Sequence, residues 1–140
     1  MIALKVKKLS ADAVLPAKHN LLAAGIDIFT NESYTLQPGE VHVFTTGIAA
    51  EFPEGHAALI WDRSGFGSKG IHRLAGVIDS DYRGEWKIVL VNLSGKPYEV
   101  RAGDKIAQCV LQRFEPAEIV EVSQVTETGR GATGFGSSGR

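Results

Sequence analysis

Short hydrophobic runs recur along the chain, and turns containing proline or glycine separate them. In residues 2–7 hydrophobic side chains alternate with lysine or alanine, a period of two that is typical of a half-buried strand. Further strands are predicted at residues 41–48, 57–61, 77–78, 87–92, 98–100, 105–111 and 119–122. No long stretch has helical periodicity, and one helical turn is expected around residues 65–70. The pattern predicts an all-β sandwich or barrel.

The strand predicted at residues 41–48 carries hydrophobic side chains on both faces. Val41 and Val43 lie on one face, and Phe44 and Ile48 lie on the other, with His42. We therefore expect this strand to be covered on both sides. His42 is then interpreted as a structural histidine rather than a catalytic one.

Length and charge narrow the class of protein. The 140 residues, 44% of them hydrophobic, are predicted to form one β domain at residues 1–122 and a flexible glycine-rich arm at residues 123–140. Fifteen basic and sixteen acidic side chains give a net charge of −1, so no overall attraction to nucleic acid or membranes is expected. Without a signal-peptide run or a membrane span, the protein is expected to be soluble and cytoplasmic.

Cysteine and histidine usage argues against two kinds of site. The single cysteine, Cys109, excludes an internal disulfide and is expected to be a core residue, in a run where Gln108 would need hydrogen-bond partners. The four histidines have no metal-ligand spacing, so zinc is not expected.

The stretch from residue 74 to residue 92 joins two hydrophobic runs through an acidic turn. Val77 and Ile78 are interpreted as the end of a buried strand, residues 87–92 as its hairpin partner, and the turn between them holds two carboxylates, an aromatic ring and a cation. A turn made only to reverse the chain needs none of these groups. The composition indicates a preorganised site centred on Asp79.

Three other segments carry candidate chemistry. Residues 62–70 combine three glycines with Arg63, Ser64 and Lys69, which suits phosphate, although a flexible basic surface loop explains the same composition and the P-loop order is missing. Residues 23–29 place Asp27 among small residues, which alone is typical of a turn. The arm at residues 128–140 has the composition of a disordered tail, yet its aromatic ring and arginines would suit an anionic, ring-bearing ligand.

Five segments together resemble, in order, the five motifs of the homotrimeric dUTPase family. They are residues 24–28, 63–70, 76–85, 103–108 and 130–139. The resemblance implies a β jelly-roll subunit, a homotrimer whose active sites are shared between chains, and Mg²⁺-dependent hydrolysis of dUTP to dUMP and pyrophosphate. It also implies a role in limiting uracil incorporation into DNA and in supplying the precursor of thymidylate.

The resemblance implies a role for each matching residue on the nucleoside side of the site. Asp79 matches the catalytic aspartate that activates water for attack on the α-phosphorus, and Tyr82 matches the residue that packs on the deoxyribose. Gly76 and Ile78 would belong to the main chain that recognises uracil. A rigid strand pair would discriminate against cytosine, because the 4-amino group of cytosine reverses the donor and acceptor that uracil presents.

On the phosphate side, Ser64 and Gln108 would contact phosphate oxygens, with Arg63 and Gly65 supporting the chain. Asp27 would hold Mg²⁺, through water. The arm would close the site: Arg130 would reach the γ-phosphate and Phe135 would stack on uracil, while the remaining contacts would come from Gly136, Ser137 and Ser138.

Three residues depart from the family's pattern, and a second aspartate lies close to Asp79 in the acidic turn. Arg73 stands where many bacterial members have asparagine near uracil, which leaves the base contact there open. Thr133 and Ser138 replace a common glycine and threonine, and both changes are mild. Asp81 is assigned a structural role.

Three alternatives remain. A dCTP deaminase shares the fold and would use a glutamate near the position of Glu85. A nucleotide sensor would bind without turnover, although Asp79 and Asp27 are both kept. A purely structural β domain would not explain the arginine, serine and aspartate gathered at glycine-rich turns.

Overall fold

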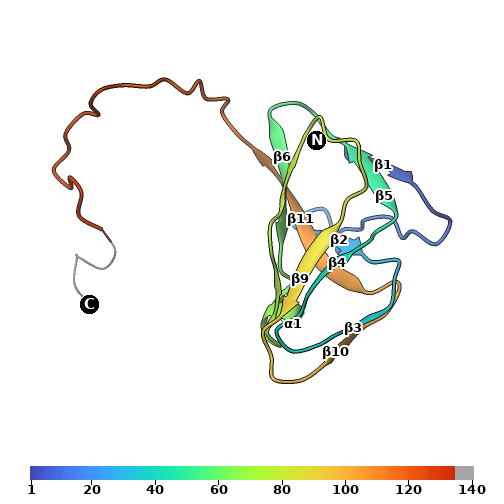
Figure 1. The fold of residues 1–140 in the computed structure, drawn as a ribbon. Coiled ribbons are helices and arrows are strands. Elements are labelled where there is room, and N and C mark those ends of the chain that lie inside the picture. The colour runs from blue at the N-terminus through green and yellow to red at the C-terminus, as the bar shows by residue number, and fades with distance from the viewer. Residues whose placement is uncertain (135–140) are drawn as a thin grey trace.

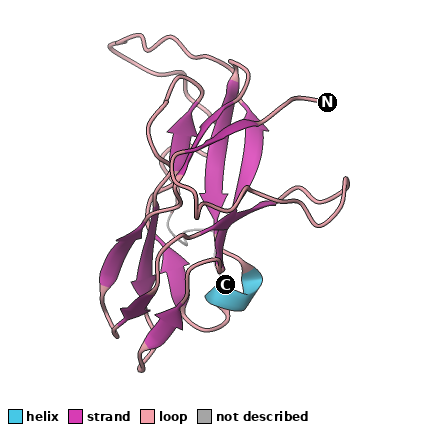
Figure 2. Ribbon diagram, turned by 90° about the vertical axis from the view of Figure 1, so that its right-hand side faces the viewer, coloured by secondary structure: helices cyan, strands magenta, loops and turns pink. Residues whose placement is uncertain are grey.

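The computed structural model describes residues 1–134, and within them the chain forms eleven strands and one short helix (Figure 1). The elements are β1 (Lys5–Lys8), β2 (Ile26–Phe29), β3 (Tyr34–Leu36), β4 (Val41–Phe44), β5 (Ile48–Glu51), β6 (His56–Trp61), α1 (Ser64–Gly67), β7 (Ile71–Arg73), β8 (Val77–Asp79), β9 (Ile88–Asn92), β10 (Tyr98–Val100) and β11 (Lys105–Arg113). Strands make up nearly all of the regular structure, and α1 lies at one end of the molecule (Figure 2). The all-β jelly-roll prediction is confirmed, as is the single helical turn.

Antiparallel pairing joins the strands into small sheets. The largest has the order β2-β11-β6-β8, and a three-stranded sheet has the order β4-β9-β7. The pairs β1-β5 and β3-β10 form two further sheets of two strands each. β11 is long enough to pair with β2 on one side and β6 on the other, and its register with β2 shifts between Lys105 and Ala107.

The core lies between the inner faces of the sheets. Strands contribute alternate side chains to it, as a period of two requires: Ile28 from β2, Ile60 from β6 and Cys109 from β11 are all buried. Trp86, just before β9, is fully buried. Cys109 is therefore the core residue that the sequence predicted, and burial raises the pKa of its thiol to about 12.

The predicted strand at residues 41–48 is interrupted. β4 ends at Phe44 and β5 begins at Ile48, because Gly47 has a φ of +66° and Thr46 donates its hydroxyl hydrogen to the carbonyl of Trp86 at 2.5 Å. The face of β4 that carries Val41 and Val43 is exposed in the single chain, so the expected cover on that side is not provided by residues 1–134.

The prediction of a last strand at residues 119–122 is wrong. After β11 the chain leaves the sheets and runs away from them (Figure 1), and residues 114–134 contain no strand. Ile119 is 98% exposed because this segment has no neighbouring strand edge to pair with. Among the described residues no helix is long and apolar enough to cross a membrane.

The predicted hairpin between residues 77 and 92 is also wrong. β8 pairs with β6, whereas β9 pairs with β4 and β7, so the acidic turn connects two different sheets. Val77 is 69% exposed and does not end a buried strand. β8 therefore has one edge that no strand of residues 1–134 pairs with.

Candidate functional site

One group of motif residues gathers where β2, β11 and the start of α1 meet. Lys105 places its Nζ 2.8 Å from Oδ2 of Asp27, and Arg63 places its Nε 3.5 Å from Oδ1. The Arg63 Nη1 also donates to the main-chain carbonyl of Lys105 at 3.0 Å. With Gln108, directly opposite Asp27 in the sheet, these residues form the phosphate cluster, named for the role that their motifs predict.

Gln108 has the partner that its burial requires. Its Nε2 donates to the main-chain carbonyl of Asp62 at 2.8 Å, which ties β11 to the residue before Arg63. Gly25 allows this arrangement, because a Cβ atom there would lie 2.1 Å from Oε1 of Gln108. The small residue of the first motif is thus needed for close approach.

A cavity of about 400 Å³ opens beside the phosphate cluster. Arg63 and Gly65 line one part of it, and Ser64 lies between them at the start of α1. The rest of the lining is Phe29, Phe66, Lys69, Tyr98, Gly103, Asp104 and Lys105. Basic and aromatic side chains therefore line a cavity that shares Arg63 and Lys105 with the phosphate cluster.

A second group of motif residues forms the acidic turn after β8. Asp79 is exposed, and within residues 1–134 its carboxylate has no hydrogen bond or ion pair. The turn around it is closed by its own contacts, since the Tyr82 N–H donates to the carbonyl of Asp79 at 3.2 Å and the Tyr82 hydroxyl to the carbonyl of Glu85 at 3.1 Å. Asp79 is thus held in place while its carboxylate stays free.

The free edge of β8 borders a cavity of about 260 Å³. Val77, Ile78, Asp79 and Tyr82 line one side of it, and residues 85–87 line the other. The main-chain N–H of Ile60 donates to the carbonyl of Gly76 at 2.8 Å, so by the alternation of an antiparallel pair Val77 directs its own N–H and C=O away from β6. Of the residues that line this edge of β8, the sequence indicated Gly76 and Ile78 but not Val77 or Lys87. The direction of the main chain depends on a register that only the strand pairing reveals.

One chain does not bring Asp79 and the phosphate cluster together. Asp27, Gln108 and Trp61 lie opposite one another across three strands of the large sheet, whereas Asp79 lies opposite Ala57. Four residues along β6 at about 3.3 Å each, and three strand spacings of about 4.8 Å, separate the Cα atoms of Asp27 and Asp79 by roughly 20 Å. The two groups occupy opposite edges of one sheet.

Of the site residues predicted in the arm, Arg130 is the one that lies within the described residues. Arg130 is exposed, and its Nε donates to the carbonyl of Thr133 at 3.0 Å, so it contacts neither group. The predictions for Phe135, Gly136, Ser137 and Ser138 lie outside the described residues.

Asp62 organises the segment between the two groups, a role that the sequence did not indicate. Its Oδ1 accepts the N–H of Arg73 at 2.8 Å, and its Oδ2 lies 2.6 Å from Nδ1 of His72. The Arg73 guanidinium lies over the ring of Trp61, 5.0 Å from its centroid. Arg73 also lines a 140 Å³ cavity next to Val77, and its Nε is buried without a partner in the described chain.

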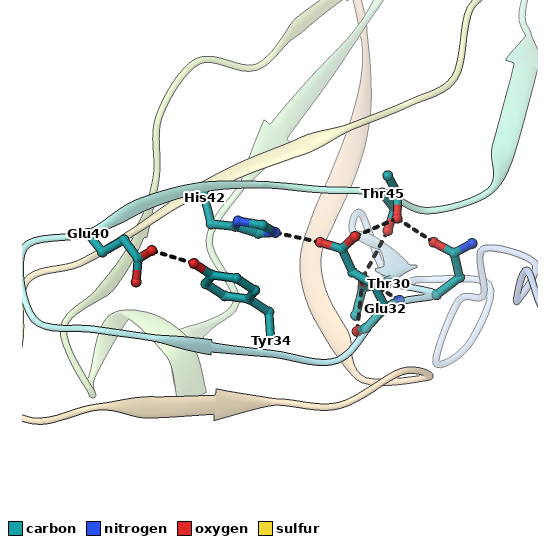
Figure 3. Close-up of polar contacts among 7 residues, drawn as sticks. Thr30, Glu32, Tyr34, Glu40, His42 and Thr45 are labelled. Carbon is teal, nitrogen blue, oxygen red and sulfur yellow. Dashed lines mark hydrogen bonds and ion pairs between the residues drawn. The ribbon is translucent and has the colours of Figure 1, made fainter.

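A separate polar network joins β3 to β4 and the turn before β3 (Figure 3). His42 stacks on Tyr34 with ring centroids 3.7 Å apart, and its Nε2 lies 2.6 Å from Oε1 of Glu32. The Tyr34 hydroxyl donates to Glu40, which lowers the pKa of that carboxyl and raises the pKa of Tyr34. These contacts confirm His42 as a structural histidine.

Residues 1–134 contain no group of three or more histidine, cysteine or acidic residues arranged to hold a metal ion. Asp27 is the carboxylate of the phosphate cluster, and both of its oxygens already face cations. Such a residue fits a Mg²⁺ ion that substrate phosphates and water hold, because Mg²⁺ keeps several waters and takes few protein carboxylates.

Comparisons with known proteins agree with the five-motif resemblance. The dUTPase family profile matches residues 11–139. A deoxyuridine 5'-triphosphate nucleotidohydrolase of Nautilia profundicola is 44% identical over 140 residues, covering 98% of this chain and 99% of that relative. One of Candida glabrata is 40% identical over 139 residues, covering 98% and 96%.

Solved structures show the same fold. A mutant dUTPase of Staphylococcus bacteriophage 80alpha with dUpNHpp superimposes with a TM-score of 0.91 at 30% identity, covering 99% of both chains. A mutant dUTPase from phage phi11 of S. aureus, described for the coordination of a structural Mg(II) ion, has a TM-score of 0.82 at 28% identity and covers 89% of this chain and 99% of that one.

Proposed function

The chain belongs to the dUTPase family, and from this premise we propose how its residues hydrolyse dUTP to dUMP and pyrophosphate. The observation that carries the mechanism is the position of Asp79, exposed and unpaired within the described chain at the rim of a cavity beside a free strand edge. The reaction would take place in the cytoplasm, where it limits uracil incorporation into DNA.

Asp79 is proposed to orient a water molecule and accept its proton as the oxygen attacks the α-phosphorus. A carboxylate held by the fold but free of partners suits a general base. The ring of Tyr82, fixed by its hydroxyl contact with Glu85, would pack on the deoxyribose. Uracil would meet the main chain of β8, including Gly76 and Ile78, with Val77 supplying the outward-facing donor and acceptor.

The phosphate cluster would bind the triphosphate. Ser64, Gly65 and Gln108 would contact phosphate oxygens, and Arg63 would balance their charge. Mg²⁺, when bound, would neutralise phosphate charge and polarise the reacting phosphoryl group, with Asp27 contacting it through water. From the arm, Arg130 and Phe135 would contact the γ-phosphate and the base, with Gly136, Ser137 and Ser138 closing the site.

We propose a homotrimer because Asp79 and the phosphate cluster must contact the same substrate molecule. Asp79 must lie at the α-phosphorus, which the phosphate cluster holds, yet roughly 20 Å separates Asp79 from Asp27 within one chain. A closed ring of identical chains brings the Asp79 edge of one subunit to the cluster of the next. The exposed face of β4, with Val41 and Val43, provides hydrophobic surface for such contacts.

The structure weighs against the deaminase alternative. Glu85, the residue near the deaminase position, accepts the main-chain N–H of Gly47 at 2.9 Å with its Oε1. This contact gives Glu85 a structural role in joining the acidic turn to β5. A sensor without turnover remains an outcome that a rate measurement distinguishes.

The test is release of pyrophosphate from dUTP with Mg²⁺, compared with dCTP, dTTP and UTP. Release from dUTP alone, strongly reduced in Asp79→Asn, is the expected result. Release of ammonia from dCTP would reassign the protein as a deaminase, and dUTP binding without turnover by the wild type would reassign it as a sensor.

A further inference from the structure

Lys69 is the basic residue of the phosphate-suited loop to which the dUTPase motifs assign no contact. It lines the same 400 Å³ cavity as Arg63 and Lys105. Those two residues share the carboxylate of Asp27, whereas Lys69 has no ion pair among residues 1–134. Among the three cations that line the cavity, Lys69 is therefore the one without an ion pair in residues 1–134.

An aromatic side chain lies next to this cation. The Lys69 Nζ lies 5.4 Å from the ring centroid of Tyr98, a distance at which an ammonium group is attracted to the ring face. Tyr98 in turn packs on Phe66 of α1, with ring centroids 5.3 Å apart. A cation–aromatic contact leaves the three N–H donors of the ammonium group available to a ligand.

The remaining acid of the cavity is already engaged. Asp104 accepts the main-chain N–H of Arg101 at 2.9 Å through Oδ2, as part of the turn into β11. A ligand in this cavity would have Arg63, Gly65 and Lys69 in its lining. Phosphate oxygens would accept hydrogen bonds from these positively charged and main-chain donors.

We propose that Lys69 binds the two terminal phosphates of the substrate and, after hydrolysis, the pyrophosphate product. This inference rests on the proposed function, in which the phosphate cluster holds the α-phosphate. The phosphates beyond it extend along the cavity to Lys69. Because the contact is made to the leaving group, Lys69 contributes to triphosphate affinity and to pyrophosphate retention, and it contributes nothing to dUMP binding.

The experiment compares Lys69→Met, which keeps the length of the side chain and its contact with Tyr98, with Lys69→Arg, which keeps the charge. Lys96→Met, at an exposed lysine outside the cavity, is the matched control. Isothermal titration calorimetry with sodium pyrophosphate and with dUMP measures both affinities without requiring turnover. Thermal unfolding checks that each variant is folded.

Lys69→Met should lower the affinity for pyrophosphate about tenfold, the size expected for one charge-assisted contact at a partly exposed site. Its KM for dUTP should rise by a similar factor, while its affinity for dUMP stays close to that of the wild type. For Lys69→Arg and Lys96→Met, both affinities and the KM should stay close to the wild-type values. Equal pyrophosphate affinity in Lys69→Met and wild type would overturn the inference, as would no pyrophosphate binding by the wild type or an equal loss of dUMP affinity. A wild type that binds pyrophosphate but does not hydrolyse dUTP would instead overturn the proposed function.

Discussion

The phosphate cluster and the acidic turn, to which we assign the two halves of the proposed chemistry, differ in which of their groups are already engaged. In the phosphate cluster every charged side chain is engaged, since Asp27 contacts both Arg63 and Lys105 and Gln108 contacts the main chain. In the acidic turn the main chain and Tyr82 are engaged, and Asp79 is left free. Ligand binding needs donors held in fixed geometry, whereas proton transfer needs a carboxylate with room for water.

Different contacts also hold the two regions in position. The phosphate cluster is fixed by contacts between side chains of β2, β11 and the residue before α1, so a change in one member disturbs the others. The acidic turn is fixed by its own main chain and by Tyr82, so the side chain of Asp79 can be replaced without loss of structure. Substitutions in the phosphate cluster should therefore disturb neighbouring side chains, whereas replacement of Asp79 should leave the structure unchanged.

The largest effect is expected for Asp79→Asn. Removing the general base should lower kcat by about a thousandfold, within the range known for positioned acids and bases, and should leave the unfolding temperature unchanged because the carboxylate has no described partner. Asp81→Asn, two residues away, is the matched control, and kinetics with thermal unfolding provide both readouts. A comparable loss of kcat in Asp81→Asn would move the base to that residue.

Mixing two inactive variants tests whether the two regions belong to different chains. In the proposed homotrimer, Asp79→Asn and Gln108→Leu chains that are unfolded and refolded together should regain about a quarter of the wild-type rate, because random assembly would pair an intact Asp79 with an intact Gln108 at one site in four. Pyrophosphate release from the mixture measures this. Activity that stays at the sum of the separate variants would mean that each chain supplies both residues.

Gly25→Ala should disturb the phosphate cluster while leaving the acidic turn intact. The new Cβ would meet Oε1 of Gln108 at 2.1 Å and force that side chain to move. We expect KM for dUTP to rise by about tenfold, the effect of one misplaced hydrogen bond to a charged group, with a smaller change in kcat. Gly95→Ala, which meets no atom within 4 Å, is the control, and equal KM values in both variants would contradict the prediction.

The smallest effect is expected in the Tyr34–Glu40 pair, which lies outside both regions. The pKa of Glu40 is lowered in the folded protein, so this contact stabilises the fold above the ordinary pKa of 4.5 and loses its effect as the pH falls through the lowered value. Tyr34→Phe should therefore unfold at a lower temperature than wild type near pH 7, and the gap should narrow below pH 4.5. Melting curves from pH 7 to pH 3 test this, with unchanged dUTP turnover expected, and a constant gap would disprove the link to Glu40.

The sequence predicted the elements better than their pairing. Hydrophobic runs between turns located β6 and β11, and the composition of the acidic turn identified Asp79 as a candidate. The same patterns suggested a hairpin between Val77 and Asn92, because local sequence does not encode which distant strand an edge will join. The strand predicted around Ile119 failed for a related reason, since hydrophobic residues form a strand only where a partner edge exists.

The candidate site shows the same limit. Residue types indicated Asp27, Arg63 and Gln108 separately, yet the shared contacts of Asp27 and the organising role of Asp62 depend on three strands meeting. The outward-facing main chain of Val77 has no side-chain signature at all. Sequence patterns reveal chemistry carried by side chains, while contacts made by the backbone depend on long-range register.

The buried thiol of Cys109 has a practical consequence for labelling and for oxidative stress. With its pKa raised to about 12 and no exposed surface, it holds almost no thiolate at neutral pH, and neither maleimides nor hydrogen peroxide should modify the folded protein. The enzyme should keep its activity under oxidants that inactivate thiol-dependent hydrolases. A single cysteine introduced in the exposed segment that follows β11 would then be the sole reactive thiol, so a fluorophore attached there could report movements of the arm without prior removal of the native residue.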